Sequence, residues 1–506
     1  MLKQPTKSFL LTLIGLTLGL PQTSWAARFD GKLTLTVTDE QTGQLIPVRM
    51  ELWNSRSRPV NVRADGAVAR DGYVVFNGEI TLELRKDSYR FLIEAGPEYQ
   101  TRPGHFTIER HAEDSTTVTL RRHVNMHDEG WWAGDLDVRQ RHKDLPLLKR
   151  AAGVSFAFGN VQENIQGKCN QEPVPAERLA GSQMAFDYRR GGGLIIFRTD
   201  ITQAQSFNVC EHAGKTSSMP VLEAAHALGA EVVALTPYAW DLPLWVAAEK
   251  LTAVQIIHRQ SWPDGKSPNE GWGRPRDRAF FPGKLGNGRY SEAIYHHLLN
   301  CGVRIPPAAG SGSGANKLPL GTNRVYVDCS DKYSEESWFE GLRAGRVMVT
   351  NGPLLRTSVE GQAPGHVFHI DKGQKRQFQI ALSLSFYEKA PVEYLEIVKN
   401  GRVEHNVRLN ELARLKGRLP PLEFDDSGWF LVRAVTSSTE TYQLATTGPY
   451  YVESNYRPRI SRTSVEYFLT WLDEAAEKFA EYENVLVDIE QAHLFWQDLL
   501  SRANAD

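Results

Sequence analysis

One short segment of the chain gathers several side chains that could do chemistry. Residues 130–144 read G-W-W-A-G-D-L-D-V-R-Q-R-H-K-D and include Asp135, Asp137, Arg139 and His142. Hydrolysis assisted by metal ions needs several carboxylates and imidazoles that converge on one point. Asp137 could bind a cation, whereas Arg139 is always protonated and would repel a dication. Asp137 beside Arg139 therefore predicts either a structural ion pair or a pocket that reads an anion.

Other candidate residues each have a structural alternative. Asp135 after a glycine suits a turn or cap, and His142 in R-Q-R-H-K-D suits a solvated loop. Asp187 in F-D-Y-R-R-G-G-G can pair with one of the two arginines that follow it. Asp241 in Y-A-W-D-L-P suits the N-cap of a following helix. His297 in Y-H-H-L-L-N suits a helix face, so none of these residues is a secure ligand by itself.

Motifs for nucleophilic or phosphate chemistry are missing from the sequence. The chain has no G-x-S-x-G elbow and no H-E-x-x-H. Ser311 lies in A-G-S-G-S-G, and we predict a structural role for it. The glycines at 191–193 precede a strand instead of leading from one into a helix, which indicates a turn and not a phosphate-binding loop.

The composition is that of a folded chain. The 506 residues are 41% hydrophobic and 23% charged, and at ~150 residues per domain they suggest about three domains. Lys and Arg number 58 against 60 Asp and Glu, for a net charge of −2. This balance provides no basic footprint, so we expect no nucleic-acid partner.

The N-terminus has the pattern of a secretory signal. Lys3 and Lys7 precede an apolar run over 9–20, which the small-residue pattern at 24–26 follows. We predict a signal peptide over 1–26 and a periplasmic or extracellular destination. No later stretch is apolar enough for a membrane helix, so no transmembrane segment is expected after signal removal.

The cysteines are few and show no metal-binding spacing. An oxidising compartment permits disulfides, and Cys169 and Cys210 lie in polar, loop-like sequence, which makes them the candidate pair. Cys301 and Cys329 border apolar segments and are predicted to be buried free thiols.

Periodicity divides the remaining chain into four parts. Alternating strands such as L-T-L-T-V-T at 33–38, separated by turns, predict a β-sandwich over 27–122. Apolar strands alternate with helical stretches over 123–350, which predicts an α/β domain with parallel strands. Strands return over 351–456, and 457–506 is predicted to be helical.

Two of these parts resemble known families. Residues 29–122 resemble the carboxypeptidase regulatory-like domain. The segment 130–144 resembles the first barrel strand of the PHP-superfamily metallohydrolases, in particular the CehA/McbA-like branch. V-V-A-L-T-P-Y-A-W, A-G-S-G-S-G and W-F-E-G-L-R-A-G-R-V-M-V-T-N-G-P are similar to later family segments. The resemblance implies a PHP-like, distorted TIM-type α/β barrel, flanked by two β-sandwich domains and C-terminal helices.

The departures from the family pattern concern its metal ligands. Asp137 and Arg139 stand where the resemblance implies two alternating histidines, and Thr236 stands where it implies a histidine before proline. Gly312 and Gly314 stand where it implies Asp and His, and a glycine has no side-chain ligand. The resemblance therefore implies a metallohydrolase scaffold whose ligand positions are replaced.

The sequence leads to one main hypothesis and two alternatives. The main one is a secreted, catalytically degenerate homologue that acts in binding or scaffolding at the cell envelope, with no metal or other cofactor. One alternative is an active hydrolase of phosphoesters, amides or esters with an altered Zn, Mn or Fe centre. The other alternative is glycan or peptide binding, because tryptophans at the mouth of a pocket would suit such ligands. Packing is nevertheless the favoured role for the tryptophans of the middle part, which are Trp131, Trp132, Trp240, Trp245, Trp262 and Trp272. The small-molecule, glycan or peptide partner and the oligomeric state are left open.

Overall fold

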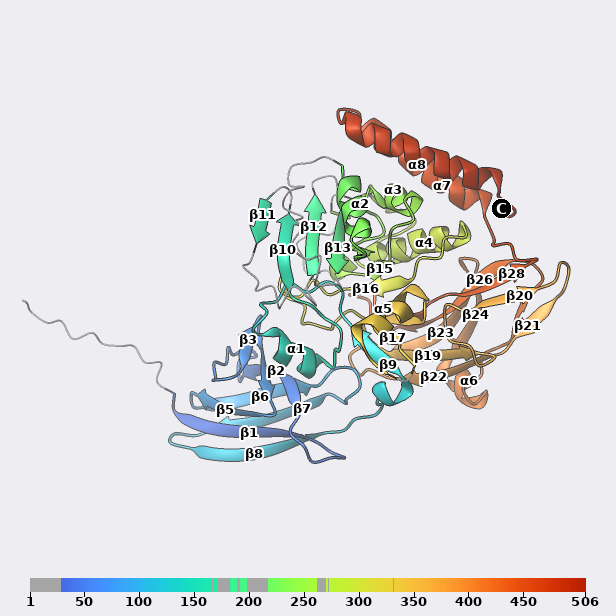
Figure 1. The fold of residues 1–506 in the computed structure, drawn as a ribbon. Coiled ribbons are helices and arrows are strands. Elements are labelled where there is room, and N and C mark those ends of the chain that lie inside the picture. The colour runs from blue at the N-terminus through green and yellow to red at the C-terminus, as the bar shows by residue number, and fades with distance from the viewer. Residues whose placement is uncertain are drawn as a thin grey trace, which may run out of the picture.

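The structure is a computed structural model that describes residues 29–165, 168–171, 183–188, 192–197, 217–261, 270–271, 273–330 and 332–506. The described chain is mixed α/β with several β-sheets, as the sequence predicts (Figure 1). The predicted signal segment lies outside the described residues. So does the predicted disulfide, because Cys210 is not described and of Cys169 only the backbone is.

The N-terminal part consists of two sheets that share one hydrophobic core. In β1 every second residue is buried, which follows from its alternating sequence. Side chains of both sheets, such as Leu35 and Met50, pack together in this core. The three-stranded sheet has the order β5-β1-β8 (Glu79–Leu84, Gly31–Asp39, Glu113–Leu120). The five-stranded sheet has the order β3-β4-β2-β6-β7 (Val68–Arg70, Tyr73–Asn77, Pro47–Asn54, Asp87–Glu94, Arg102–Ile108).

The middle part contains a seven-stranded sheet of mixed direction. Its order is β11-β10-β12-β13-β14-β15-β16 (Lys168–Gln171, Asn160–Ile165, Gln183–Tyr188, Gly192–Phe197, Glu231–Ala234, Ala253–Ile257, Pro307–Ala309). β14, β15 and β16 are parallel, as predicted, but β13 pairs antiparallel with both β12 and β14. The accompanying helices are α1, α2, α3 and α4 (Leu145–Ala152, Met219–Ala227, Leu242–Ala247, Gly286–Asn300). The prediction of parallel strands is therefore confirmed for β14, β15 and β16, and the antiparallel pairing of β13 departs from it because periodicity reports burial and not strand direction.

A nine-stranded sheet runs from the middle part into the C-terminal part. Its path is β20-β28-β26-β27-β18-β17-β9 (Val367–Ile370, Tyr450–Ser454, Gly428–Thr436, Leu444–Thr447, Val347–Thr350, Arg324–Asp328, Trp131–Gly134), and β23 (Val392–Lys399) joins β26 to β24 (Arg402–Arg408). Helix α5 (Glu335–Arg343) leads into β18. Two further strand pairs and a short helix complete this part: β19 and β22 (Leu354–Val359, Ile380–Ser385), β21 and β25 (Arg376–Phe378, Leu422–Phe424), and α6 (Leu409–Arg414).

The described strands do not close into a hydrogen-bonded barrel. β9 pairs with β17 and so belongs to the nine-stranded sheet, whereas β16 is the edge of the seven-stranded one. The two sheets are linked where the chain after β9 passes β16. There the Leu136 amide donates to the Ala309 carbonyl at 3.1 Å, and Val138 forms a single bridge with Ser313.

The C-terminal helices pack onto the middle part. α7 (Arg462–Lys478) and α8 (Glu483–Ser501) form an antiparallel pair, seen in red in Figure 1. Trp496 is fully buried and its indole N–H donates to the Pro243 carbonyl at 3.1 Å. None of the helices in the described ranges is both long and apolar enough to span a membrane.

Several predicted buried residues lie in the core. Trp131, Trp240 and Trp245 are buried, which matches the packing role, while Trp262 and Trp272 lie outside the described residues. Cys301 and Cys329 are buried free thiols, as predicted.

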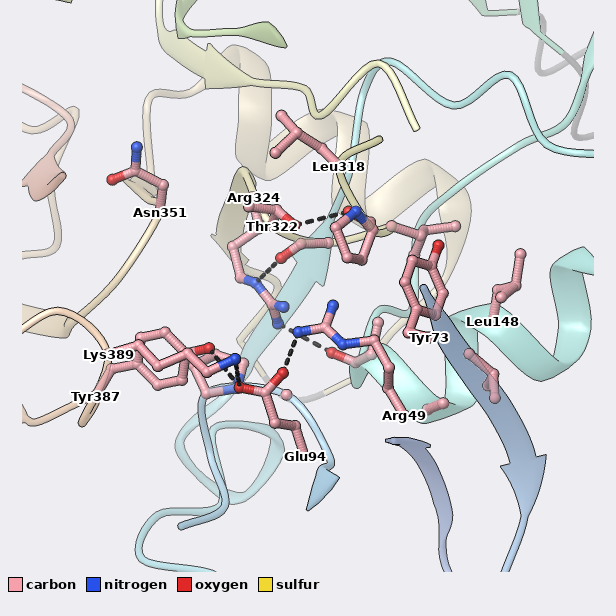
Figure 2. A pocket seen from close by; sticks show the side chains of 18 of the residues that line it. Arg49, Tyr73, Glu94, Leu148, Leu318, Thr322, Arg324, Asn351, Tyr387 and Lys389 are labelled. Atoms are coloured by element: carbon pink, nitrogen blue, oxygen red, sulfur yellow. Dashed lines mark hydrogen bonds and ion pairs between the residues drawn. The ribbon is translucent and has the colours of Figure 1, made fainter. Parts of the chain in front are cut away.

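The N-terminal, middle and C-terminal parts of the chain meet around Glu94, at the end of β6. The loop before β23 supplies Tyr387 and Lys389, and β17 supplies Arg324, which Figure 2 shows around one cavity. The Tyr387 hydroxyl donates to the Glu94 carboxylate at 3.1 Å. Side chains from distant parts of the chain therefore contact one another here.

Candidate functional site

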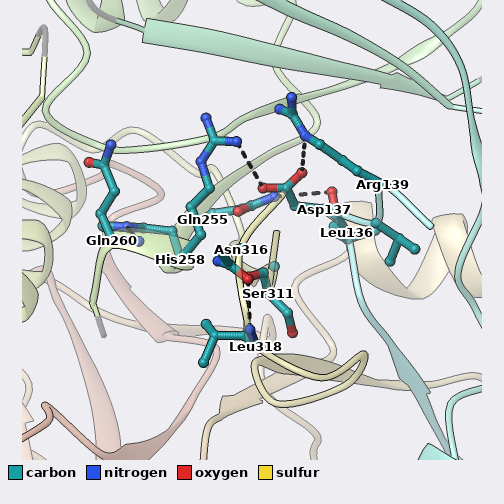
Figure 3. A network of polar contacts seen from close by, with 12 residues as sticks. Leu136, Asp137, Arg139, Gln255, His258, Gln260, Ser311, Asn316 and Leu318 are labelled. Atoms are coloured by element: carbon teal, nitrogen blue, oxygen red, sulfur yellow. Dashed lines mark hydrogen bonds and ion pairs between the residues drawn. The ribbon is translucent and has the colours of Figure 1, made fainter. Parts of the chain in front are cut away.

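The centre of the site is Asp137, which follows β9 and is fully buried. Arg139 Nε donates to Asp137 Oδ1 at 3.2 Å, and Arg259 Nη1 lies 4.0 Å from Asp137 Oδ2. Figure 3 shows the Arg139 side chain reaching the Asp137 carboxylate. We call Asp137, Arg139, Gln255, His258, Arg259 and Gln260 the Asp137 cluster. Asp137 and Arg139 therefore form an ion pair, which is one of the two roles predicted for them.

The end of β15 supplies the other half of the Asp137 cluster. The strand is buried along its whole length and ends at Ile257, so the polar residues that follow emerge at its carboxyl end. Gln255 Nε2 donates to the Leu136 carbonyl at 3.2 Å, which ties β15 to the segment that carries Asp137. Gln255, His258 and Arg259 were not among the sequence candidates. The signal that could have found His258 and Arg259 is the run H-R-Q directly after an apolar strand.

Gly312 and Gly314 make room for the arginines. A Cβ on Gly312 would lie 2.8 Å from both Cβ and Cδ of Arg259, and one on Gly314 would collide with the backbone carbonyl of Arg139. Both glycines have positive φ, +64° and +97°. These positions therefore serve the Arg–Asp–Arg arrangement through their backbone shape.

We expect Gly314→Ala to destabilise the protein more than Gly153→Ala. Both positions have positive φ, which costs a residue with a Cβ about 1–2 kcal/mol. A Cβ on Gly153 would meet nothing within 4 Å, whereas one on Gly314 would collide with backbone. The extra loss should be roughly 1 kcal/mol or more, measured as the shift in the midpoint of chemical unfolding. Equal shifts for the two variants would contradict the tight approach at Gly314.

The Asp135 side chain is engaged by backbone amides, which gives it a structural role and not that of a ligand-binding residue. Its carboxylate accepts from the amides of Asp137 at 3.2 Å, Ser311 at 2.9 Å and Gly321 at 2.8 Å. The side chain is fully buried, and burial raises its pKa to about 6 against the lowering effect of these hydrogen bonds. Its role is therefore that of the predicted turn residue, extended to a second loop.

His258 and Ser291 resemble a catalytic pair in composition but not in hydrogen-bond direction. Nε2 of His258 lies 2.9 Å from Ser291 Oγ, and that hydroxyl donates to the Asn287 carbonyl at 3.0 Å. The other ring nitrogen accepts from the Gln260 amide at 3.3 Å. Nε2 must then carry the proton and donate to the serine, so it is not placed to take a proton from it. Burial and the charge of Arg259 lower the pKa of His258 to about 3.

Ser311 is also engaged in structural hydrogen bonds. Its hydroxyl donates to the Asn323 carbonyl at 3.2 Å and accepts from the Asn323 amide at 3.0 Å. Both bonds hold the loop in place, which agrees with the structural role expected from the sequence.

Most of the other sequence candidates lie apart from the Asp137 cluster. Asp241 stands at the N-cap of α3, but its side chain accepts from Ser218 Oγ at 2.6 Å instead of capping the helix. His297 stacks on Tyr467 of α7, with ring centroids 4.2 Å apart. Thr236 is buried after β14, and His142 is half-buried beside Gly159. Asp187 lies in β12, where the structure describes only its backbone.

The donor set at the Asp137 cluster does not fit a metal ion. In the part of the chain that the structure describes, no three His, Cys, Asp or Glu side chains are grouped so as to hold one. Asp137 Oδ1 already accepts from Arg139, and a second guanidinium lies beside Oδ2. Two fixed positive charges at this distance would repel a dication by several kcal/mol in a protein interior.

Comparison with known proteins provides no family. No family model and no curated protein matches the chain. Among solved structures, the N-terminal four Ig domains of Dscam1 isoform 8.4 match with 7% identity and a TM-score of 0.15, over 85% of this chain and 73% of that chain. So low a TM-score carries no argument about fold or function, and the case for a function depends on the residues themselves.

Proposed function

We propose that this chain is a secreted binding or scaffolding protein of the cell envelope, built on a PHP-like metallohydrolase scaffold without the metal centre. The observation that carries the proposal is the buried carboxylate of Asp137 between Arg139 and Arg259. In this proposal the three-part organisation is a carboxypeptidase regulatory-like sandwich, a PHP-like α/β domain and a C-terminal sandwich.

Arg139 and Arg259 support a binding role because they stand where a metal-assisted hydrolase would require ligands for a metal ion. A metal-assisted hydrolase needs open coordination positions and donors that converge on them. Here the carboxylate is committed to a guanidinium, and Gly312 and Gly314 are shaped around the two arginine residues. The same groups form an internal ion cluster that links the end of β9 to the end of β15. Such a cluster holds a framework in one shape, which is what a scaffold requires.

Metal analysis tests this proposal directly. We expect the full chain, purified without chelators after growth with added zinc, manganese and iron, to hold well below one ion per chain. Asp137→Asn is the matched variant, because it removes the one carboxylate of the cluster and keeps the side-chain shape. An ion that is tightly held by the natural chain and lost in Asp137→Asn would overturn the proposal in favour of a hydrolase with an altered centre.

A further inference from the structure

We infer that the cavity where the three parts of the chain meet binds a small organic carboxylate with an apolar body. The cavity has a volume of about 390 Å³ and is lined from all three parts (Figure 2). That volume lies within the range of about 300–1,000 Å³ that is typical of small-molecule sites. None of its lining residues belongs to the Asp137 cluster. The inference can therefore stand or fall independently of the proposed function.

One wall of the cavity holds charges that already compensate each other. Glu94 is ion-paired with Arg49, and Lys389 Nζ lies 2.6 Å from Glu94 Oε1 and 3.6 Å from Glu51 Oε1. Burial raises the pKa of Glu94, but the charges of Arg49 and Lys389 outweigh burial and lower it to about 2. The carboxylates of Glu94 and Glu51 on this wall are thus matched by the two cations, Arg49 and Lys389.

Arg324 provides a further positive charge without such a match. The residue is 6% exposed, and it donates from Nε to the Gly321 carbonyl at 2.7 Å and from Nη1 to the Ala152 carbonyl at 3.1 Å. No carboxylate within the described ranges forms an ion pair with it. On the adjoining wall, Nε of Arg49 is buried and has no hydrogen-bond acceptor among the described residues. Counting Arg49, Lys389 and Arg324 against Glu51 and Glu94, the lining carries three cations and two anions.

A buried guanidinium without a counter-charge favours an anionic ligand. Placing a charge out of water is costly unless an opposite charge or full hydrogen bonding compensates it. A carboxylate suits this role because two oxygens match the planar fork of a guanidinium. A Cβ on Gly321 would lie 2.9 Å from Nη2 of Arg324, so the glycine allows the loop to approach this group closely.

The rest of the lining selects for an apolar body. Leu148, Ala151, Leu318 and Leu320 contribute aliphatic side chains, and Tyr73 contributes an aromatic ring. A free inorganic anion would leave these side chains facing water-filled space, whereas an organic acid would bury them. Because each part of the chain supplies some of the wall, such a ligand would also hold the parts together and raise the unfolding temperature.

The test compares carboxylates with their neutral amides. Butyrate, octanoate, benzoate and 4-phenylbutyrate, each beside its primary amide, are titrated calorimetrically into the full chain, with inorganic phosphate as a further probe. We expect at least one carboxylate to bind roughly tenfold or more tightly than its amide, since a charge-assisted contact is lost in the amide. No binding by any of the four carboxylates, equal binding of acids and amides, or phosphate binding as tight as that of the best acid would each overturn the inference.

Variants of the cavity lining, with a control outside it, locate the binding. Arg324→Met should abolish the preference for the acid, whereas Arg121→Met, at a side chain that is 67% exposed and does not line the cavity, should leave it unchanged. If Arg324→Met fails to fold, Leu318→Trp serves instead, because it fills the cavity from a half-buried position. Unchanged acid binding in a folded Arg324→Met protein, or in Leu318→Trp, would show that the acid binds elsewhere and would overturn the inference.

Discussion

Glu94→Ala is expected to lower the free energy of unfolding by about 3–5 kcal/mol, because it removes one partner of a buried ion cluster. Glu94 is 4% exposed and accepts from Arg49, from Lys389 and from the Tyr387 hydroxyl. Without it, the Arg49 charge stays buried and loses its partner. The N-terminal and C-terminal parts also lose the contact that joins β6 to the loop before β23.

The measurement is thermal and chemical unfolding of the full chain, with limited proteolysis to show whether the N-terminal part separates. Glu83→Ala is the matched control, since Glu83 lies in the same part, is 44% exposed and pairs with Lys32 at 3.4 Å. An exposed pair of this kind contributes roughly 0–1 kcal/mol. If Glu94→Ala cost no more than Glu83→Ala, the cluster would not stabilise the junction.

The pH dependence provides a second check on Glu94. Its pKa is lowered from 4.5 to about 2 in the folded chain, so the ionised form is the one that stabilises the fold. This stabilisation is complete above pH 4.5 and is lost as the pH falls toward about 2. The difference in stability between the natural chain and Glu94→Ala should therefore shrink across that range. A constant difference would contradict the ion-pair origin of the effect.

Asp135→Ala is the other change for which we expect a large effect. The variant leaves the amides of Asp137, Ser311 and Gly321 without their acceptor in a buried place. An unsatisfied buried amide costs about 1–3 kcal/mol, so the sum should be roughly 3 kcal/mol or more. Hydrogen exchange at the Ser311 and Gly321 amides should also speed up, because the loop that they belong to loses its anchor.

Asp328→Ala is the control for Asp135→Ala. The Asp328 side chain in β17 accepts from a single amide, that of Ser330 at 2.8 Å, so a smaller loss of stability is expected. Chemical unfolding measures both variants. Faster exchange at Ser311 without a larger loss of stability than in Asp328→Ala would mean that the loop is anchored by other contacts.

Local structure followed from the sequence to a large extent. The alternation at 33–38 predicted a strand, and β1 covers it; the apolar stripes after 464 predicted helices, and α7 and α8 are found there. The apolar stretch at 231–236 predicted the strand β14. Strand partners did not follow, because a buried strand reads alike in parallel and antiparallel sheets. For this reason the place of β9 in the C-terminal sheet was not predicted.

The candidate site could be predicted from the sequence only in part. Asp137 and Arg139 were predicted to form either an ion pair or a pocket that reads an anion, and the structure contains the ion pair. Arg259 joins them from the end of a strand far along the chain. The run H-R-Q marks this residue as polar after an apolar strand, but it does not show that the side chain faces Asp137. His142, Asp241 and His297 were also candidates from the sequence, yet their side chains contact other elements.

By itself, the sequence indicated many of the strands and helices, such as β1, β14, α7 and α8. Local backbone preference and side-chain periodicity are properties of neighbouring residues, so a single chain displays them. Only the tertiary structure decided that Arg259 faces Asp137, that Lys389 reaches Glu94, and that Arg324 lines a cavity between three parts. The reason is that charges interact through distance in space, which the packing of sheets sets and residue order does not.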